Sequence, residues 1–128
     1  MFFGLDGLNT ANKSGRHGAA RQTAKEILVA TQKFTGVIPP VVVPDTEDHQ
    51  LDVASFERSI NRMIDAGVDG LFFLGSSGEV VFSTDERRRQ IISEAVRIVD
   101  HRVPVMVGII DTETERMIEH GKVAQELG

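Results

Sequence analysis

The residues whose types and spacing could do chemistry form one short run, Gly75-Ser76-Ser77-Gly78-Glu79, directly after an apolar stretch that ends at Leu74. Two glycines permit a tight turn and a close approach of a ligand to the backbone. Two adjacent serines add hydroxyl groups beside free amides, which suits an anion such as a carboxylate. An ordinary Gly-Ser connection between a strand and a helix is the alternative that this spacing alone leaves open.

Nucleophilic catalysis by these serines is not indicated. The run is not a G-x-S-x-G nucleophile elbow, because Glu79 stands where the second glycine would have to be. No histidine lies nearby in sequence to act as a base, and we expect Glu79 to cap or orient the serine loop rather than to act as an acid. The chain has no cysteine, which excludes disulfides, thiolate metal sites and a thiol nucleophile.

The remaining polar groups predict solvated surface rather than a metal or phosphate site. Three histidines (His49, His101 and His120) are far apart in the sequence and are interpreted as surface residues, so no metal is predicted. The arginine run Arg87–Arg89 is interpreted as a solvated helix face rather than a phosphate clamp. The acidic group at residues 45, 47 and 48 is interpreted as a solvated loop.

Composition narrows the class of protein. The chain has 128 residues, 41% of them hydrophobic and 26% charged, which is typical of a globular protein. Its formal charge of −5 argues against nucleic-acid binding, which needs a clustered basic surface. No apolar run is long enough to span a membrane, so no membrane partner is predicted. A cytoplasmic enzyme is the default expectation.

Residues 1–33 differ from the rest in charge. They hold five Lys or Arg and only two acidic residues, whereas the remainder is strongly acidic. The first part is rich in Gly, Asn and Ser and lacks periodicity, which predicts a flexible N-terminal extension. A short helix over residues 19–32 is compatible with the pattern. A targeting peptide is the alternative, weakened by Asp6 and Glu26.

Beyond residue 33, strand and helix signals alternate three times. The predicted strands are the proline-interrupted run Val37–Val43, then Val68–Leu74 and Val105–Ile110. A helix capped by Asp52 and closed by Gly67 follows the first strand. Capping boxes at Ser83/Glu86 and Thr112/Glu115 predict the starts of the other two helices, and Gly128 could end the last. Three successive βα units predict a parallel sheet.

Such a sheet would be unfinished, because its edge strand and apolar faces would lack partners. As a self-sufficient domain the sequence is therefore expected to be unfinished. The serine loop lies at the carboxyl end of a predicted strand, where barrel enzymes keep their active sites. A complete flavodoxin-like domain is disfavoured because no glycine-rich loop follows the first predicted strand.

Several blocks in order resemble one family. The segment Phe34-Thr35-Gly36, the loop Gly75–Glu79 and the strand Pro104–Gly108 are similar to the dihydrodipicolinate synthase/N-acetylneuraminate lyase family, as are residues 66–71 and Glu86-Arg87. The resemblance covers Phe34–Gly128. It implies an α/β fold in which residues 34–128 form the N-terminal three βα units of a TIM (β/α)₈ barrel, truncated. It also implies a homo-oligomer, a tetramer, for the full-length protein.

The chemistry that the resemblance implies is that of a class I aldolase or lyase. In that family a lysine on the sixth strand forms a Schiff base with pyruvate or with a 2-keto acid that releases it, without a cofactor or a metal. Carried over to this chain, Ser77 with Gly75 and Gly78 would bind the pyruvate carboxylate. Ser76 would be the catalytic residue of the loop, in a hydroxyl proton relay with a tyrosine.

The positions at which the chain differs from the family pattern are as informative as the matches. The chain has no tyrosine. Three of its four lysines precede residue 34 and Lys122 falls within a predicted helix, so the chain holds no Schiff-base lysine and is expected to be inactive alone. Thr112 stands where asparagine is frequent, and Val43-Pro44 where threonine-proline is common, which suggests a branch away from the true synthase. The run 71–75 is more similar to the sugar-acid aldolases of the family. A non-catalytic truncated relative, which binds small anions or assembles with full-length subunits, is the alternative.

Overall fold

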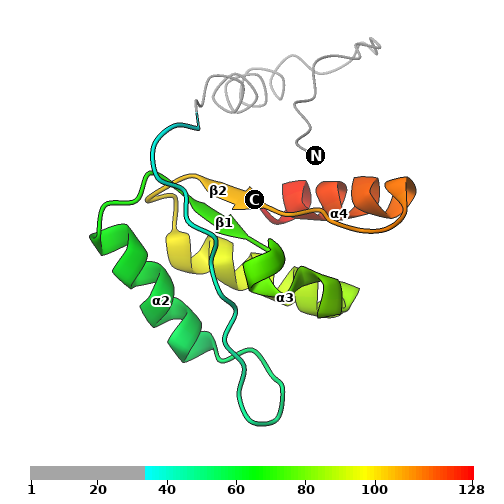
Figure 1. The fold of residues 1–128 in the computed structure, drawn as a ribbon, viewed down its shortest axis with the longest axis horizontal. Coiled ribbons are helices and arrows are strands. Elements are labelled where there is room, and N and C mark those ends of the chain that lie inside the picture. The colour runs from blue at the N-terminus through cyan, green and yellow to red at the C-terminus, as the bar shows by residue number, and fades with distance from the viewer. Residues whose placement is uncertain (1–33) are drawn as a thin grey trace, which may run out of the picture. The chain divides into compact units, whose positions relative to one another are not determined.

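The computed structural model describes residues 34–128, so the extension predicted over residues 1–33 lies outside the described residues. Three helices and two strands alternate along this part of the chain (Figure 1). Their order is α2 (Val53–Asp65), β1 (Leu71–Phe73), two short 3₁₀ turns η1 (Ser76–Gly78) and η2 (Val80–Phe82), α3 (Asp85–Val99), β2 (Val105–Val107) and α4 (Thr114–Leu127).

The two strands are parallel, as the alternation of strands and helices predicted. Leu71 pairs with Val105 and Phe73 with Val107. The connection between the strands runs through α3, the crossover that a parallel pair requires. The parallel α/β arrangement is therefore confirmed, although the strands are shorter than the predicted ranges.

The predicted first strand, Val37–Val43, is present only as an extended segment. It joins β1 through one parallel bridge, at which Val41 N–H donates to the Phe72 carbonyl (2.8 Å) and Phe72 N–H to the Pro39 carbonyl (3.0 Å). The next donor toward the N-terminus would be the amide of residue 39, which is proline and has none. In the other direction Leu74 adopts φ 53°, so β1 turns away from the segment.

Helix α2 begins and ends as the sequence predicted. The Asp52 side chain accepts the Ser55 N–H at 3.0 Å, which makes it the N-cap. At the other end Gly67 takes φ 83°, the left-handed conformation that glycine adopts without steric cost. The caps fix the length of α2, whose buried residues are Phe56 and Ile60.

The predicted starts of the other two helices are each wrong by one residue. The N-cap of α3 is Thr84, whose hydroxyl accepts the Arg87 N–H, and not Ser83, whose own N–H closes η2 on the Val80 carbonyl. The N-cap of α4 is Glu113, without a side-chain hydrogen bond. Thr112 does not cap α4, because its amide (2.7 Å) and its hydroxyl (3.5 Å) both donate to Asp111 Oδ1.

The core lies between the strands and the helices. Figure 1 shows α2 and α3 side by side along the strand pair, with α4 beside α3. Phe56 of α2 and Phe73 of β1 pack edge to face, with ring centroids 5.8 Å apart. Other fully buried side chains come from β1, the residue after it and α3, and include Leu71, Leu74, Ile91 and Val99. In residues 34–128 no helix has the length and apolar character needed to cross a membrane.

Candidate functional site

The serine loop at the carboxyl end of β1 has a residue in the left-handed conformation at each of its ends. Leu74, the residue after β1, has φ 53°, and Glu79, the residue after η1, also has φ 53°. Non-glycine residues rarely adopt this conformation, and a buried leucine in it is strained. The two left-handed residues bracket Gly75–Gly78, so the serines sit in a short 3₁₀ turn of defined shape.

Both glycines of the loop are buried and packed closely. A Cβ on Gly75 would come within 2.6 Å of the Phe72 ring, and one on Gly78 within 3.3 Å of the Val41 carbonyl oxygen. The loop therefore rests on β1 on one side and on the extended segment on the other. Close packing of protein against protein accounts for these glycines, and the predicted approach of a ligand to them stays a prediction.

The two serines form the exposed side of the loop. Ser76 and Ser77 are exposed, while Gly75 and Gly78 beneath them are buried. The amides of Ser76 and Ser77 are the first two of a 3₁₀ turn, so no carbonyl within the turn can accept them. Two hydroxyls and two amides are thus available side by side, a donor set that suits a carboxylate or another small anion. The predicted site residues of this loop are together in space because they are adjacent in the chain.

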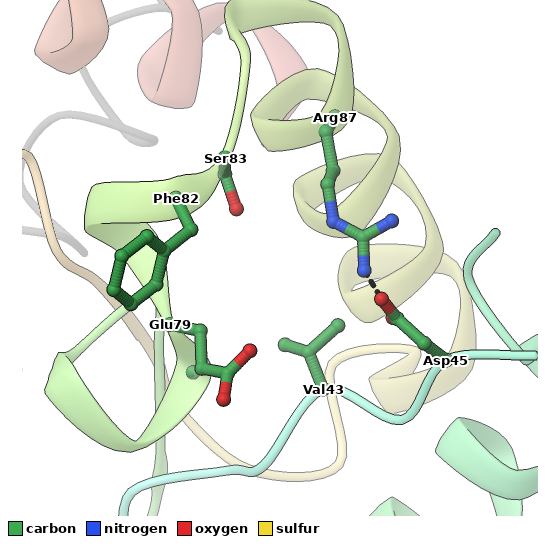
Figure 2. A pocket seen from close by; sticks show the side chains of 7 residues that line it. Val43, Asp45, Glu79, Phe82, Ser83 and Arg87 are labelled. Atoms are coloured by element: carbon green, nitrogen blue, oxygen red, sulfur yellow. Dashed lines mark hydrogen bonds and ion pairs between the residues drawn. The ribbon is translucent and has the colours of Figure 1, made fainter. Parts of the chain in front are cut away.

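A small hollow of about 80 Å³ lies under the far end of the loop. Its lining includes Glu79, Phe82 and Ser83, and the Glu79 carboxylate and the Ser83 hydroxyl point into it (Figure 2). Across the hollow the Arg87 guanidinium forms an ion pair with Asp45. Ser76 and Ser77 do not line this space, so it is distinct from the exposed donor set.

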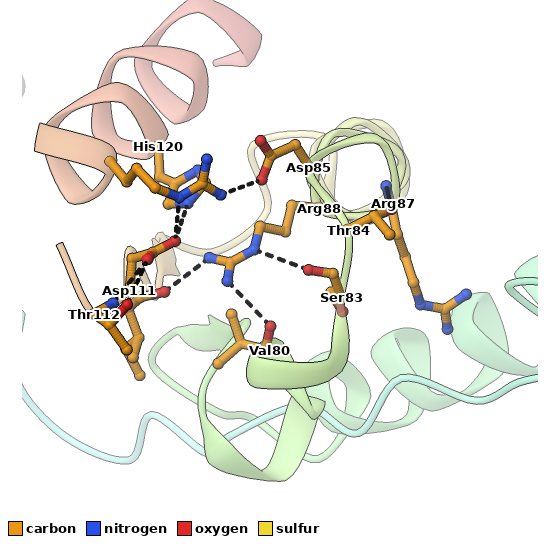
Figure 3. A network of polar contacts seen from close by, with 11 residues as sticks. Val80, Ser83, Thr84, Asp85, Arg87, Arg88, Asp111, Thr112 and His120 are labelled. Atoms are coloured by element: carbon orange, nitrogen blue, oxygen red, sulfur yellow. Dashed lines mark hydrogen bonds and ion pairs between the residues drawn. The ribbon is translucent and has the colours of Figure 1, made fainter.

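A second polar cluster follows β2, the neighbouring strand (Figure 3). Asp111 Oδ2 lies 3.0 Å from Arg116 Nε and 3.0 Å from His120 Nε2, and Arg116 Nη2 lies 2.9 Å from Asp85 at the start of α3. The hydrogen bond from His120, helped by the Thr112 amide and Arg116, holds the pKa of the Asp111 carboxyl well below its ordinary value. The cluster joins the residue after β2 to both α3 and α4.

Two sequence-based interpretations, of Arg88 and of His120, are wrong. Arg88, which was interpreted as part of a solvated face, is 7% exposed and donates to the carbonyls of Val80, Ser83 and Ile110. His120, which was interpreted as a surface residue, has a side chain only 12% exposed, beside Asp111. The spacing of Arg116 and His120, four residues apart on one helix, is the signal that could have found the Asp111 cluster.

The other predicted surface groups are exposed, and one of them forms an ion pair. His49 and His101 are exposed. Asp45 is exposed and forms an ion pair with Arg87. Arg87 is thus the arginine of the run that contacts the loop following the extended segment. Lys122 is exposed on α4, as predicted. Within residues 34–128 no three His, Asp or Glu side chains come together in a way that could hold a metal ion.

Fold and loop together define the class of protein: a parallel α/β unit with two exposed serines in a short turn at the carboxyl end of a strand. Residues 33–128 match the sequence model of the dihydrodipicolinate synthetase family. The chain belongs to that family.

Individual relatives agree with this assignment. The Escherichia coli protein "Putative 2-dehydro-3-deoxy-D-gluconate aldolase YagE" is 46% identical over 95 residues, which are 74% of this chain and 32% of the relative. The 4-hydroxy-tetrahydrodipicolinate synthase of Salinibacter ruber is 39% identical over the same shares of the two chains. The crystal structure of YagE in complex with pyruvate superposes with a TM-score of 0.73 at 45% identity, covering 76% of this chain and 33% of YagE. The chain spans about a third of the length of the relatives it matches.

Proposed function

We propose that this chain provides the carboxylate-binding loop of a pyruvate-dependent class I aldolase or lyase. Ser77 holds the carboxylate of pyruvate, or of a 2-keto acid, with its hydroxyl and its amide, and Gly75 and Gly78 let the backbone take the required shape. Ser76 donates and accepts a proton through its hydroxyl. The carbon–carbon bond is made or broken on a Schiff-base lysine that residues 34–128 do not contain, because Lys122 is exposed on α4.

One observation carries the proposal: two exposed serines occupy the start of a 3₁₀ turn between two left-handed residues, at the carboxyl end of a parallel strand. Strained backbone of this kind concentrates where a site must hold a fixed geometry. Hydrogen bonds from hydroxyls and amides to an ionised carboxylate are stronger than those between neutral groups. The YagE complex with pyruvate, a family member 45% identical to this chain, supports pyruvate as the ligand.

The partner of pyruvate is proposed to be a sugar-derived aldehyde. The support is the higher identity to YagE, named for 2-dehydro-3-deoxy-D-gluconate, than to the synthase of Salinibacter ruber. The predicted resemblance of Leu71–Gly75 to the sugar-acid aldolases points the same way.

Binding can be tested on the chain itself. We expect pyruvate to shift the backbone amide resonances of Ser76, Ser77 and Gly78 in a heteronuclear NMR titration, whereas methyl pyruvate, which has no carboxylate, leaves them unchanged. Ser77→Ala should weaken pyruvate binding about tenfold, since a hydrogen bond to a charged group is lost. The matched control is Ser93→Ala, an exposed serine of α3. Equal shifts with pyruvate and with methyl pyruvate would exclude a carboxylate site.

Catalysis can be tested in a chimera. Residues 34–128 would replace the matching 95-residue segment of YagE, and borohydride would trap any Schiff base formed with pyruvate, for detection by intact mass. We expect a reduced pyruvyl adduct on the chimera and none on the 128-residue chain alone. A chimera that folds like YagE and forms no adduct would refute the assignment of the loop. An adduct or pyruvate release with the lone chain would refute the view that it lacks the lysine.

A further inference from the structure

Arg88 is the charged residue that residues 34–128 bury most deeply. It lies in the second turn of α3 and is 7% exposed. Within the described part of the chain its guanidinium has no carboxylate partner at ion-pair distance; its hydrogen-bond acceptors are all backbone carbonyls. Burying a guanidinium costs free energy unless its N–H donors find acceptors. The three carbonyls supply those acceptors, and the question is what the buried charge does there.

The acceptors belong to two loops at the same edge of the strand pair. Nη2 donates to the Val80 carbonyl at 3.2 Å and Nε donates to the Ser83 carbonyl at 3.4 Å, so both hold η2, directly behind the serine loop. Nη1 donates to the Ile110 carbonyl at 2.9 Å, three residues beyond the end of β2. Figure 3 shows the guanidinium lying between the two loops. One side chain thus fixes the distance between them.

The loop after β2 is itself held firmly from the other side. Asp111, the neighbour of Ile110, is bound by Arg116 and His120 of α4, and Arg116 also reaches Asp85 of α3. Arg88 therefore ties η2 to an anchored segment. Only a planar guanidinium has donors that point toward two loops at once, whereas a lysine ammonium is a single point on a flexible stem.

We propose that Arg88 is a positioning residue for carboxylate binding. By fixing η2 against the loop after β2, it holds the preceding turn, Ser76–Gly78, in the shape that presents its hydroxyls and amides to one anion. This inference rests on the proposed function of the serine loop. It adds a residue outside the loop on which affinity for the anion depends.

The test uses the full 128-residue chain and the three consecutive arginines. Arg88→Lys keeps the charge without the fork, Arg88→Met removes both, and Arg89→Met is the control, because Arg89 is exposed and adjacent. Without ligand, amide hydrogen exchange at Gly78, Glu79 and Phe82 should be about tenfold faster in both Arg88 variants, while exchange in α2 is unchanged. Pyruvate affinity, from the NMR titration above, should fall about tenfold in Arg88→Lys, the worth of one charge-assisted hydrogen bond. Arg89→Met should match the unchanged chain in both measurements.

The outcomes separate the two proposals. Arg88→Lys with unchanged loop exchange and unchanged pyruvate affinity would overturn the positioning role, even if Arg88→Met fails to fold. Exchange that rises equally in α2 and in the loop would also overturn it, since Arg88 would then only stabilise the whole fold. If pyruvate does not shift the serine-loop amides of the unchanged chain, the proposed function fails, and the exchange measurement without ligand still reports whether Arg88 fixes the loop.

Discussion

The substitution Gly108→Ala adds one methyl group that should push the serine loop away from β2. Gly108 follows β2 directly, and its N–H donates to the Phe73 carbonyl at 2.9 Å. A Cβ at this position would overlap the Leu74 carbonyl oxygen and lie 2.9 Å from the Leu74 carbonyl carbon. Both are backbone atoms, so no side-chain rotation can relieve the clash. Gly108→Ala must therefore push Leu74, the residue from which the serine loop starts, away from β2.

The expected cost follows from two contributions. Forcing an extra methyl group into a packed site costs about 1–3 kcal/mol. Loss of the hydrogen bond between Gly108 and Phe73, if the two strands separate here, adds about 1 kcal/mol. We expect Gly108→Ala to lower the free energy of unfolding by about 2–4 kcal/mol, a large share of the ~5–15 kcal/mol of a typical domain.

Urea unfolding followed by far-ultraviolet circular dichroism measures this cost. With the denaturant dependence usual for a small protein, the midpoint should fall by about 1–2 M. Gly121→Ala is the matched control, because a Cβ at Gly121 would meet only Ile109 Cδ1, at 3.8 Å. In the middle of α4 that change should stabilise the chain by about 0.5–1 kcal/mol. A Gly108→Ala variant as stable as the unchanged chain would show that Leu74 and Gly108 are not packed as described.

Three further predictions concern single residues. Phe56→Leu removes the edge-to-face contact with Phe73 and should cost about 1–2 kcal/mol in the same urea assay; no change would mean that the ring pair contributes nothing. Asp100, exposed with φ 45° at the end of α3, should tolerate Asp100→Gly with a gain of up to about 1 kcal/mol, because glycine adopts this conformation freely; a loss would show that the Asp100 side chain stabilises the helix end. The pKa of Asp111 is lowered in the folded chain, so its contribution to stability is complete above the ordinary value of 3.8 and is lost as the pH falls below it. The difference in urea midpoint between the unchanged chain and Asp111→Asn should therefore shrink as the pH falls from 4 to 2, and a difference that stays the same over this range would contradict the lowered pKa.

What could be predicted from the sequence depends on contacts between neighbours in the chain. Asp52 caps α2 through a residue three positions on, and Gly67 closes it through its own backbone angle. The serine loop is of the same kind, because Ser76 and Ser77 are adjacent to each other and to the end of β1. These features need no knowledge of the fold beyond the order of its elements.

The errors arise where a distant residue decides the outcome. The first predicted strand is reduced to one bridge because Pro39 falls at the donor position opposite β1, a register that the sequence does not reveal. Thr112 was expected to cap α4, but its amide and its hydroxyl both donate to the carboxylate of Asp111, which is itself held by Arg116 and His120. Arg88 reads as one of three similar arginines until the loops that it joins are seen together.

The division between local and distant contacts has a consequence for the site. A set of hydrogen-bond donors on adjacent residues can be recognised from the sequence, but its affinity for an anion depends on how rigidly the turn is held. Here two residues hold the turn: Gly108 packs against Leu74, and Arg88 binds η2. Each of the two lies more than five residues from the turn in the sequence. A relative could therefore keep both serines and lose the site through a change at residue 88 or 108. Ser77→Ala removes a hydrogen-bond donor, whereas Gly108→Ala leaves all donors present but displaces the loop that carries them. Both variants should bind pyruvate more weakly, but only Gly108→Ala should also lower the free energy of unfolding.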